Sequence, residues 1–194
     1  MTAHFSETTR LQGERWLKYF YFTRAAFSAV WVALAFTIGQ HVPAIGAALL
    51  IVYPVWDALA NYVDMSRSGG VRENFTQAFN VFASSAVAIA VIVVLHIDTS
   101  SVLDVFGVWA VMSGLLQLAT AVRRRKRFGA QWAMILSGGQ SALAGVLFIA
   151  QAHAPVPPAI VKVAGYAGVG AIYFLASALW LSVGQLRRKF ASMP

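Results

Sequence analysis

Residues 102–127 read VLDVFGVWAVMSGLLQLATAVRRRKR, a long apolar stretch followed by five consecutive basic residues. An apolar stretch of about 20 residues is long enough to cross the hydrocarbon core of a bilayer as a helix. In the whole chain 59% of the residues are hydrophobic and only 11% are charged, too few charges for a soluble domain of this size. The sequence therefore predicts a protein that spans a membrane.

Other parts of the chain contain apolar stretches of similar length. We expect six membrane-spanning helices, at residues 19–38, 44–63, 77–97, 102–122, 131–152 and 160–183. The apolar residues are continuous and do not alternate with polar ones, which favours helices over the strands of a barrel. The predicted fold is all-α, a polytopic bundle of six transmembrane helices.

The basic residues lie at alternate ends of these stretches. Apart from Arg24 and Lys162, every Lys and Arg lies before the first stretch, between the second and third, between the fourth and fifth, or after the sixth. Short loops rich in Lys and Arg stay in the cytoplasm, so we expect both chain ends there. We also expect these loops to contact anionic lipid, and we expect no nucleic-acid partner.

The chain divides into a single membrane domain with two polar ends. We expect residues 1–18 to be a cytoplasmic interfacial segment, residues 19–183 to be the membrane domain, and residues 184–194 to be a basic cytoplasmic tail. The chain has no cysteine, which excludes disulfides, thiolate catalysis and Cys-ligated metals. Phosphate-binding, metalloprotease and nucleophile-elbow motifs are also missing, so we expect no catalytic residue and no cofactor.

The six stretches repeat with offsets of 56 and 57 residues. In the even-numbered stretches the aligned residues are Tyr53-Pro-Val-Trp-Asp57-Ala58, Trp109-Ala-Val-Met-Ser113-Gly114 and Tyr166-Ala-Gly-Val-Gly170-Ala171. In the odd-numbered stretches they are Arg24-Ala25, Asn80-Val81 and Ser137-Gly138. We therefore predict three parallel two-helix repeats, at about residues 19–70, 75–127 and 131–188. Small residues such as Ser84, Gly138 and Gly145 favour close helix packing and would permit a homo-oligomer.

Two segments carry a resemblance to a known family. Trp109-Ala-Val-Met-Ser-Gly-Leu-Leu-Gln-Leu-Ala-Thr-Ala-Val followed by Arg123-Arg124-Arg125 resembles the repeat of the HdeD-like family of bacterial membrane proteins. Ile135-Leu-Ser-Gly-Gly-Gln-Ser-Ala-Leu-Ala-Gly145 is similar to the helix that follows in that family. The resemblance extends over about residues 20–188 and implies a six-helix protein of the bacterial inner membrane. Through the family's namesake it implies a link to acid resistance, and it supplies no catalytic residues.

A few polar residues lie inside the predicted spans. Arg24 and Asp57 are the only charges well inside them, each about 7–9 Å from the cytoplasmic boundary at a rise of about 1.5 Å per residue. Asn61 shares a helix face with Asp57, Asn80 occupies the position of Arg24 in the second repeat, and Gln77 is one turn from Asn80. The predicted intramembrane polar cluster is Arg24, Asp57, Asn61, Gln77 and Asn80.

This cluster has two interpretations. Arg24 and Asp57 could pair to fix the register of the first two helices, which would relieve part of the cost of about 3 kcal/mol for a lone charge. Alternatively, Asp57 could take up protons or help to bind a solute in a small proton-linked transporter or channel. We favour an integral membrane protein without catalytic chemistry that acts in an envelope or acid-stress response. A membrane enzyme is a further alternative that no motif supports.

Three histidines follow the repeat at the opposite ends of the helices. His41, His96 and His153 lie after the three odd-numbered stretches, 55 and 57 residues apart. An unperturbed histidine has a pKa of about 6.5, so this trio is a candidate pH sensor on the outer face. Three imidazoles could also bind zinc, but loop histidines that simply follow the repeat are the plainer interpretation, and we expect no metal.

Overall fold

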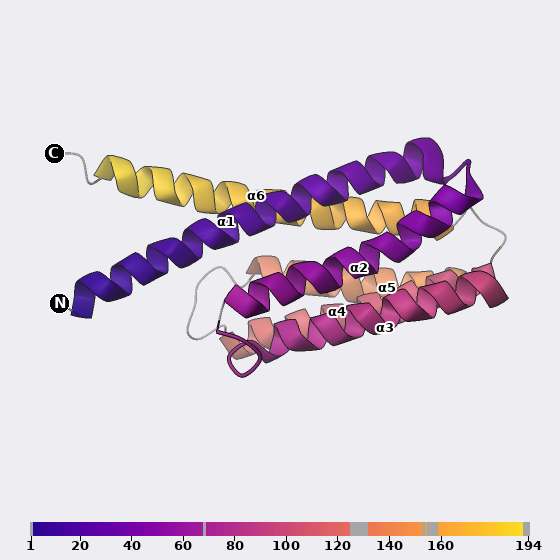
Figure 1. Cartoon of the computed structure of the whole chain (residues 1–194), viewed down its shortest axis with the longest axis horizontal. Helices are drawn as coiled ribbons and strands as arrows, with labels where there is room; N and C mark the ends of the chain where they lie inside the picture. Colours follow the sequence, from indigo (N-terminus) through magenta and orange to yellow (C-terminus); the bar gives the residue numbers. More distant parts are fainter. Residues whose placement is uncertain (1, 68, 125–131, 153, 155–158, 192–194) are drawn as a thin grey trace. The chain divides into compact units, whose positions relative to one another are not determined.

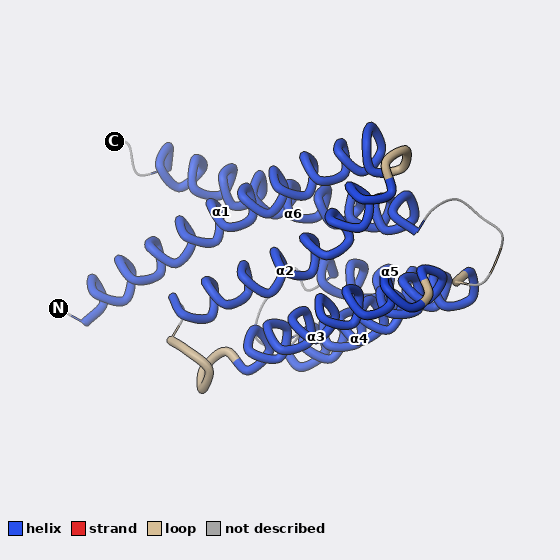
Figure 2. The backbone as a smooth tube through the Cα atoms, turned by 45° about the vertical axis from the view of Figure 1, so that its right-hand side comes forward, coloured by secondary structure: helices blue, strands red, loops and turns tan. Residues whose placement is uncertain are grey.

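The computed structural model describes residues 2–67, 69–124, 132–152, 154 and 159–191 (Figure 1). The elements are α1 (Thr2–Leu34), the π-helix η1 (Ala35–Gly39), α2 (Pro43–Arg67), α3 (Phe75–Ile97), the 3-10 helix η2 (Thr99–Ser101), α4 (Val102–Arg124), α5 (Trp132–Gln151) and α6 (Ala159–Ala191). Figure 2 shows helices and loops and no strand in these described ranges, which confirms the all-α prediction.

The length and apolarity of the helices fit a membrane protein. Among the described residues, five segments could cross a membrane: Gln12–Gly39, Pro43–Arg67, Phe75–Ile97, Thr99–Ala119 and Ala159–Arg188. Residues Ile135–Gln151 of α5 form a shorter apolar helix. Large apolar side chains such as Phe82 and Trp180 are 73% exposed, as expected where lipid covers the surface. The protein is therefore a multi-pass membrane protein.

Two helices extend well beyond their apolar stretches. α1 and α6 each have 33 residues. A helix of that length is about 50 Å long, whereas the hydrocarbon core is about 30 Å thick. Residues 2–18 contain no proline, and their polar side chains are compatible with a helix in water. The polar segment at residues 2–18 therefore continues α1 without a break.

The chain forms two compact units. The first contains Met1–Val30 and Ala167–Pro194, and the second contains Trp31–Tyr166. In the first unit α1 and α6 contact each other through side chains: Tyr21 stacks on Phe174 with ring centroids 6.2 Å apart, and Lys18 donates a hydrogen bond to Gln185.

In the second unit two pairs of neighbouring helices pack most extensively. These pairs are α2 with α3 and α4 with α5, whereas α3 and α4 share fewer contacts. Each close pair therefore joins the second helix of one predicted repeat to the first helix of the next. The three-repeat arrangement itself stays a prediction.

Glycines bring α4 and α5 together. Gly107 and Gly114 of α4 lie against Gly145 and Gly138 of α5, and we call these four residues the glycine seam. A Cβ atom on Gly114 would lie 2.5 Å from the carbonyl oxygen of Gly138, and one on Gly145 would lie 2.5 Å from that of Gly107. Because any side chain would collide with backbone there, the close approach of the two helices requires glycine.

A tight turn directs α3 back along α2. Gly69 and Gly70 have φ angles of 101° and 79°, and the N–H of Gly70 donates to the carbonyl of Met65 at 3.0 Å. This six-to-one bond with a left-handed glycine ends the helix as a Schellman motif. The turn sets α2 and α3 side by side in antiparallel directions.

Candidate functional site

Polar side chains line the contact between α2 and α3. Residues three or four apart share a helix face, so α2 presents one polar row and α3 presents another. Hydrogen bonds join the antiparallel rows at two levels, Asp57 with Ser84 and Asp64 with Gln77, and helix spacing places Asn61 and Asn80 at a level between them. We call the three levels together the polar seam. On α2 the seam extends over eight residues, 57–64, a rise of about 10 Å.

Asp57 receives hydrogen bonds from both helices. The hydroxyl of Ser84 donates to Asp57 Oδ2 at 2.7 Å, and Asn61 Nδ2 donates to the same oxygen at 3.0 Å. Asn61 Nδ2 also donates to the backbone carbonyl of Asp57 at 2.8 Å. Ser84 and Asn61 are both buried. Hydrogen bonds to a carboxylate are stronger than those between neutral groups, so this level ties α2 to α3 directly.

A second carboxylate lies two turns along α2. Asp64 is buried, and Gln77 Nε2 lies 3.4 Å from its Oδ2 atom, a long hydrogen bond. From Asp64 the seam continues toward the turn between α2 and α3, near Arg67 and Arg72. We call the end of the second unit at this turn the basic end, and the opposite end, near His41 and His96, the histidine end.

The polar seam stops at Asp57 and Ser84. Toward the histidine end the same faces carry Leu50 on α2 and Ala88 and Val91 on α3, and all three are buried. The contact between α2 and α3 is therefore polar on the side of the basic end and apolar on the side of the histidine end.

Four aromatic rings lie one turn beyond Asp57. Tyr53 precedes Asp57 by four residues, and its ring centroid lies 4.7 Å from that of Trp31 and 6.0 Å from that of Trp109. Trp109 also meets Phe106 edge to face at 5.8 Å. We call Trp31, Tyr53, Phe106 and Trp109 the aromatic cluster. Trp31, Phe106 and Trp109 are buried, so the cluster forms a packed core next to Asp57, where the polar seam ends.

Among the predicted cluster residues, Asp57 and Asn61 are hydrogen-bonded to each other, and Gln77 is bonded to Asp64. Asn80 lies on the same face of α3 as Gln77 and Ser84, and the cluster as a whole stays a prediction. Arg24 belongs to the first unit, where its guanidinium lies over the ring of Phe174 at 4.4 Å and over that of Phe20 at 5.7 Å. Such cation–π contacts favour a cation in an apolar setting. The predicted pairing of Arg24 with Asp57 stays a prediction.

Ser84 and Asp64 are absent from the predicted cluster. Ser84 has a signal in the sequence, because Ser28, Ser84 and Ser141 follow the offsets of the repeat. They are only 3%, 0% and 6% exposed. Ser141 shows that this position forms polar contacts, since its hydroxyl donates to the carbonyl of Ala110 at 2.9 Å and lies 2.8 Å from the Tyr166 hydroxyl. A buried hydroxyl that recurs with the repeat therefore marks a helix contact.

The predicted histidine trio is described only in part. His41 and His96 are exposed at the histidine end, and His96 Nδ1 donates to the carbonyl of Ile92 at 2.7 Å. His153 lies outside the described residues. Within the described ranges, no group of three His, Cys, Asp or Glu residues could hold a metal ion. A response of the histidines to pH stays a prediction.

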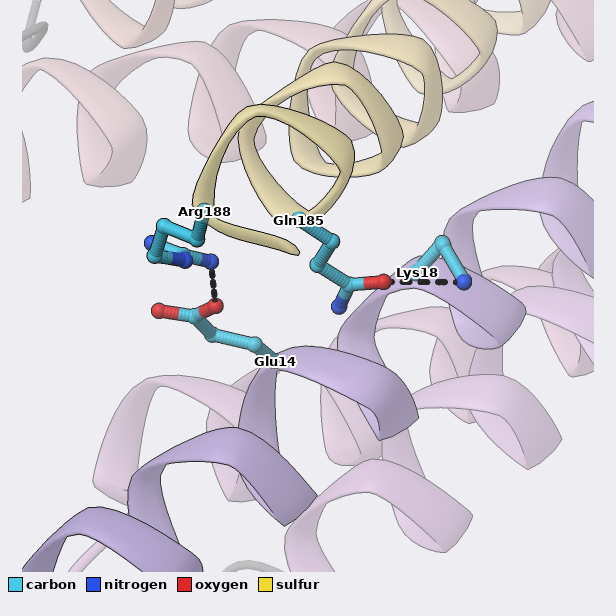
Figure 3. A network of polar contacts seen from close by, with 4 residues as sticks. All are labelled: Glu14, Lys18, Gln185 and Arg188. Carbon is cyan, nitrogen blue, oxygen red and sulfur yellow. Dashed lines mark hydrogen bonds and ion pairs between the residues drawn. The ribbon is translucent and has the colours of Figure 1, made fainter. Parts of the chain in front are cut away.

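Polar contacts also join the long helices of the first unit (Figure 3). Arg188 of α6 forms an ion pair with Glu14 of α1, and Lys18 Nζ donates to Gln185 Oε1 at 2.9 Å. We call these four residues the clasp. Surface ion pairs contribute little to stability, typically about 0–1 kcal/mol. Of the five consecutive basic residues that begin at Arg123, those at 125–127 lie outside the described residues.

The fold defines a multi-pass helical membrane protein, and one comparison refines that class. Residues 82–150 match the family described as a short repeat of unknown function (DUF308), the domain of HdeD-like membrane proteins. The match covers about a third of the chain and is consistent with the resemblance noted in the sequence. It contains the glycine seam and Ser84, whereas α2 with Asp57 lies outside it. No curated protein and no solved structure matches the chain.

Proposed function

We propose that this chain is an integral protein of the bacterial inner membrane that acts without covalent chemistry in the response of the envelope to acid or related stress. The observation that carries this proposal is the match of residues 82–150 to the domain of HdeD-like membrane proteins. The polar seam then has a structural role. Unpaired polar groups are costly inside a membrane, and the hydrogen bonds to Asp57 reduce that cost while they fix α2 against α3.

The proposal includes an orientation. The turn between α2 and α3 carries Arg67 and Arg72, and α4 ends at Arg124, so basic residues gather at one end of the second unit. This distribution supports a cytoplasmic location for the basic end and for both termini. Anionic headgroups of the cytoplasmic leaflet are the expected partners of the basic residues there.

A deletion strain tests this proposal. We expect the strain to survive acid challenge less well than its parent, and we expect the wild-type gene to restore survival. A gene that encodes the Phe82→Leu variant serves as a control in the same strain. This variant changes an exposed apolar side chain outside the polar seam, so it should also restore survival. A deletion strain that survives acid and other envelope stresses as well as its parent would contradict the proposed role.

The polar seam favours a second candidate function, a small proton-linked channel or transporter. An ionisable group inside a membrane is by default a candidate functional site. Asp57 could accept a proton there, and the predicted cluster adds Arg24 as a second charged participant. Purified protein in liposomes with an entrapped pH-sensitive dye should then carry protons, and Asp57→Asn should stop the flux. Flux equal to that of empty liposomes would reject this candidate.

A further inference from the structure

The polar seam and the aromatic cluster follow each other along the same helices of the second unit. On α2 the side chains change from Asp57 to Tyr53 within one turn, and on α3 they change from Ser84 to Ala88 within one turn. We infer that the polar seam is a one-sided access path for protons from the basic end to Asp57, and that the aromatic cluster is the barrier that closes it toward the histidine end. This inference deepens the second candidate function and rests on it for its physiological meaning.

The seam has the chemistry of a proton path. Its three levels are about one helical turn apart, about 5 Å, a distance that one water molecule or one side-chain rotation can bridge. Asp57 and Asp64 can each bind a proton, and Asp64 lies between Asp57 and the basic end. A hydroxyl can donate or accept, so Ser84 can stay bonded to Asp57 when the carboxylate becomes a carboxylic acid. The contact between Ser84 and Asp57 can therefore persist in both protonation states.

The aromatic cluster has the properties of a barrier. Its rings touch at centroid distances of 4.7, 5.8 and 6.0 Å, and three of the four residues are buried. Trp31 is held in place because its Nε1 atom donates to the carbonyl of Leu49 at 2.8 Å. The four rings are apolar over most of their surface, and the Tyr53 hydroxyl is the one oxygen among their side chains, so the cluster offers no row of acceptors that could carry a proton onward. The path consequently ends at Asp57.

A proline lies between the seam and the barrier. Pro54 is inside α2, directly after Tyr53 and three residues before Asp57. Proline supplies no N–H to the helix and kinks it, so α2 is most easily deformed at this point. A local bend at Pro54 would move the Tyr53 ring relative to Trp31 and Trp109. The barrier is thus placed where the helix can open it.

Removal of the barrier tests the inference, and the core offers a matched control. Trp109→Ala removes the ring that contacts both Tyr53 and Phe106. Phe148→Ala removes an equally buried ring that contacts Tyr166 and does not belong to the cluster. Each variant is purified, shown to be folded by circular dichroism, and reconstituted with a pH-sensitive dye and an imposed proton gradient. Trp109→Leu, a milder change, is measured beside Trp109→Ala in case the latter does not fold.

We expect Trp109→Ala to raise proton flux at least about tenfold over the wild type, because water enters the gap next to polar groups. Asp57→Asn in the Trp109→Ala background should lower the flux to that of the Asp57→Asn single variant, and Phe148→Ala alone should leave the wild-type flux unchanged. A folded Trp109 variant without extra flux would overturn the inference. So would extra flux that persists with Asp57→Asn, or equal flux through Phe148→Ala.

The two proposals fail separately. If the wild type shows no proton flux and the Trp109→Ala variant does, the result contradicts transport by the native protein and supports the barrier. A wild type that conducts and is unaffected by Trp109→Ala supports transport and overturns the barrier.

Discussion

The α2–α3 pair and the α4–α5 pair are equivalent in the predicted repeat, yet they are held together by different chemistry. In α4–α5, glycines let two backbones touch, and one buried hydroxyl, that of Ser141, also donates across the contact to the carbonyl of Ala110. In α2–α3, Ala58 and Val81 occupy the positions of Gly114 and Gly138, and side chains hydrogen-bond across the contact. The same helix arrangement can thus be fixed mainly by backbone shape, as in α4–α5, or mainly by side-chain hydrogen bonds that end on a carboxyl group, as in α2–α3.

The family match divides along the same line. It includes the glycine seam and leaves out α2. The matched repeat therefore contains the close packing of α4 and α5, whereas the carboxylates of the polar seam lie in the part of the chain outside it.

The largest expected effect is the loss of the glycine seam. We expect Gly114→Val to lower the free energy of unfolding by about 3 kcal/mol or more, because the new side chain collides with the backbone of α5. Gly139→Val is the matched control on α5, since a Cβ atom there meets nothing within 4 Å. Thermal unfolding of both purified proteins gives the comparison. Equal stability of the two variants would show that close backbone contact does not hold this pair.

A smaller effect is expected for the polar seam. Ser84→Ala removes one of the donors to Asp57 and should cost about 1–2 kcal/mol of unfolding free energy. The neighbouring Ser85 is exposed and donates only to Val81 of its own helix, so Ser85→Ala should cost less than about 0.5 kcal/mol. The same unfolding assay measures both. If Ser85→Ala lowered the free energy of unfolding as much as Ser84→Ala, the hydrogen bond between the two helices would contribute no more to stability than one within a helix.

Access of water to the polar seam can be measured by cysteine labelling, because the chain has no cysteine of its own. Ser84→Cys should react with a small hydrophilic thiol reagent added from the basic end. Ala88→Cys, one turn toward the histidine end, should react about tenfold more slowly, because its buried neighbour on the same face, Val91, is apolar, whereas position 84 adjoins the polar groups of the seam. Equal labelling rates at the two positions would contradict the expectation that water reaches α3 at position 84 and not at position 88.

The smallest effect is expected for the ion pair of the clasp, Arg188 with Glu14, which is exposed to water. A double-mutant cycle with Glu14→Gln and Arg188→Gln should give a coupling free energy below about 1 kcal/mol. Raising the salt concentration should reduce it further. A coupling free energy larger than the loss of unfolding free energy in Ser84→Ala would show that the exposed ion pair contributes more to stability than the buried hydrogen bond.

Two simple rules apply to the residues of the polar seam that the sequence singled out. Helix periodicity placed Asn61 on the face of Asp57, and the repeat placed Asn80 and Gln77 at the matching depth. The antiparallel turn then brought the two faces together. Ser84 escaped because a serine in an apolar helix looks like a small packing residue, and only its partner on α2 reveals the hydrogen bond.

Other features depend on partners far away in the chain. Phe20 lies four residues before Arg24 on the same helix, so its cation–π contact follows from periodicity. Phe174 comes from α6, and nothing local to Arg24 indicates it. The full lengths of α1 and α6 were also beyond prediction, because hydropathy detects where a helix is apolar and not where it ends. The glycines of α5 were recognisable as packing residues, but their partners on α4 were not.

The uninterrupted course of α6 as far as Ala191 has a practical consequence. A soluble helical domain joined there in register would continue the rod without a flexible joint. The orientation of the added domain would then follow that of α6. In electron microscopy, this rigid domain outside the membrane would allow images of the small protein to be aligned.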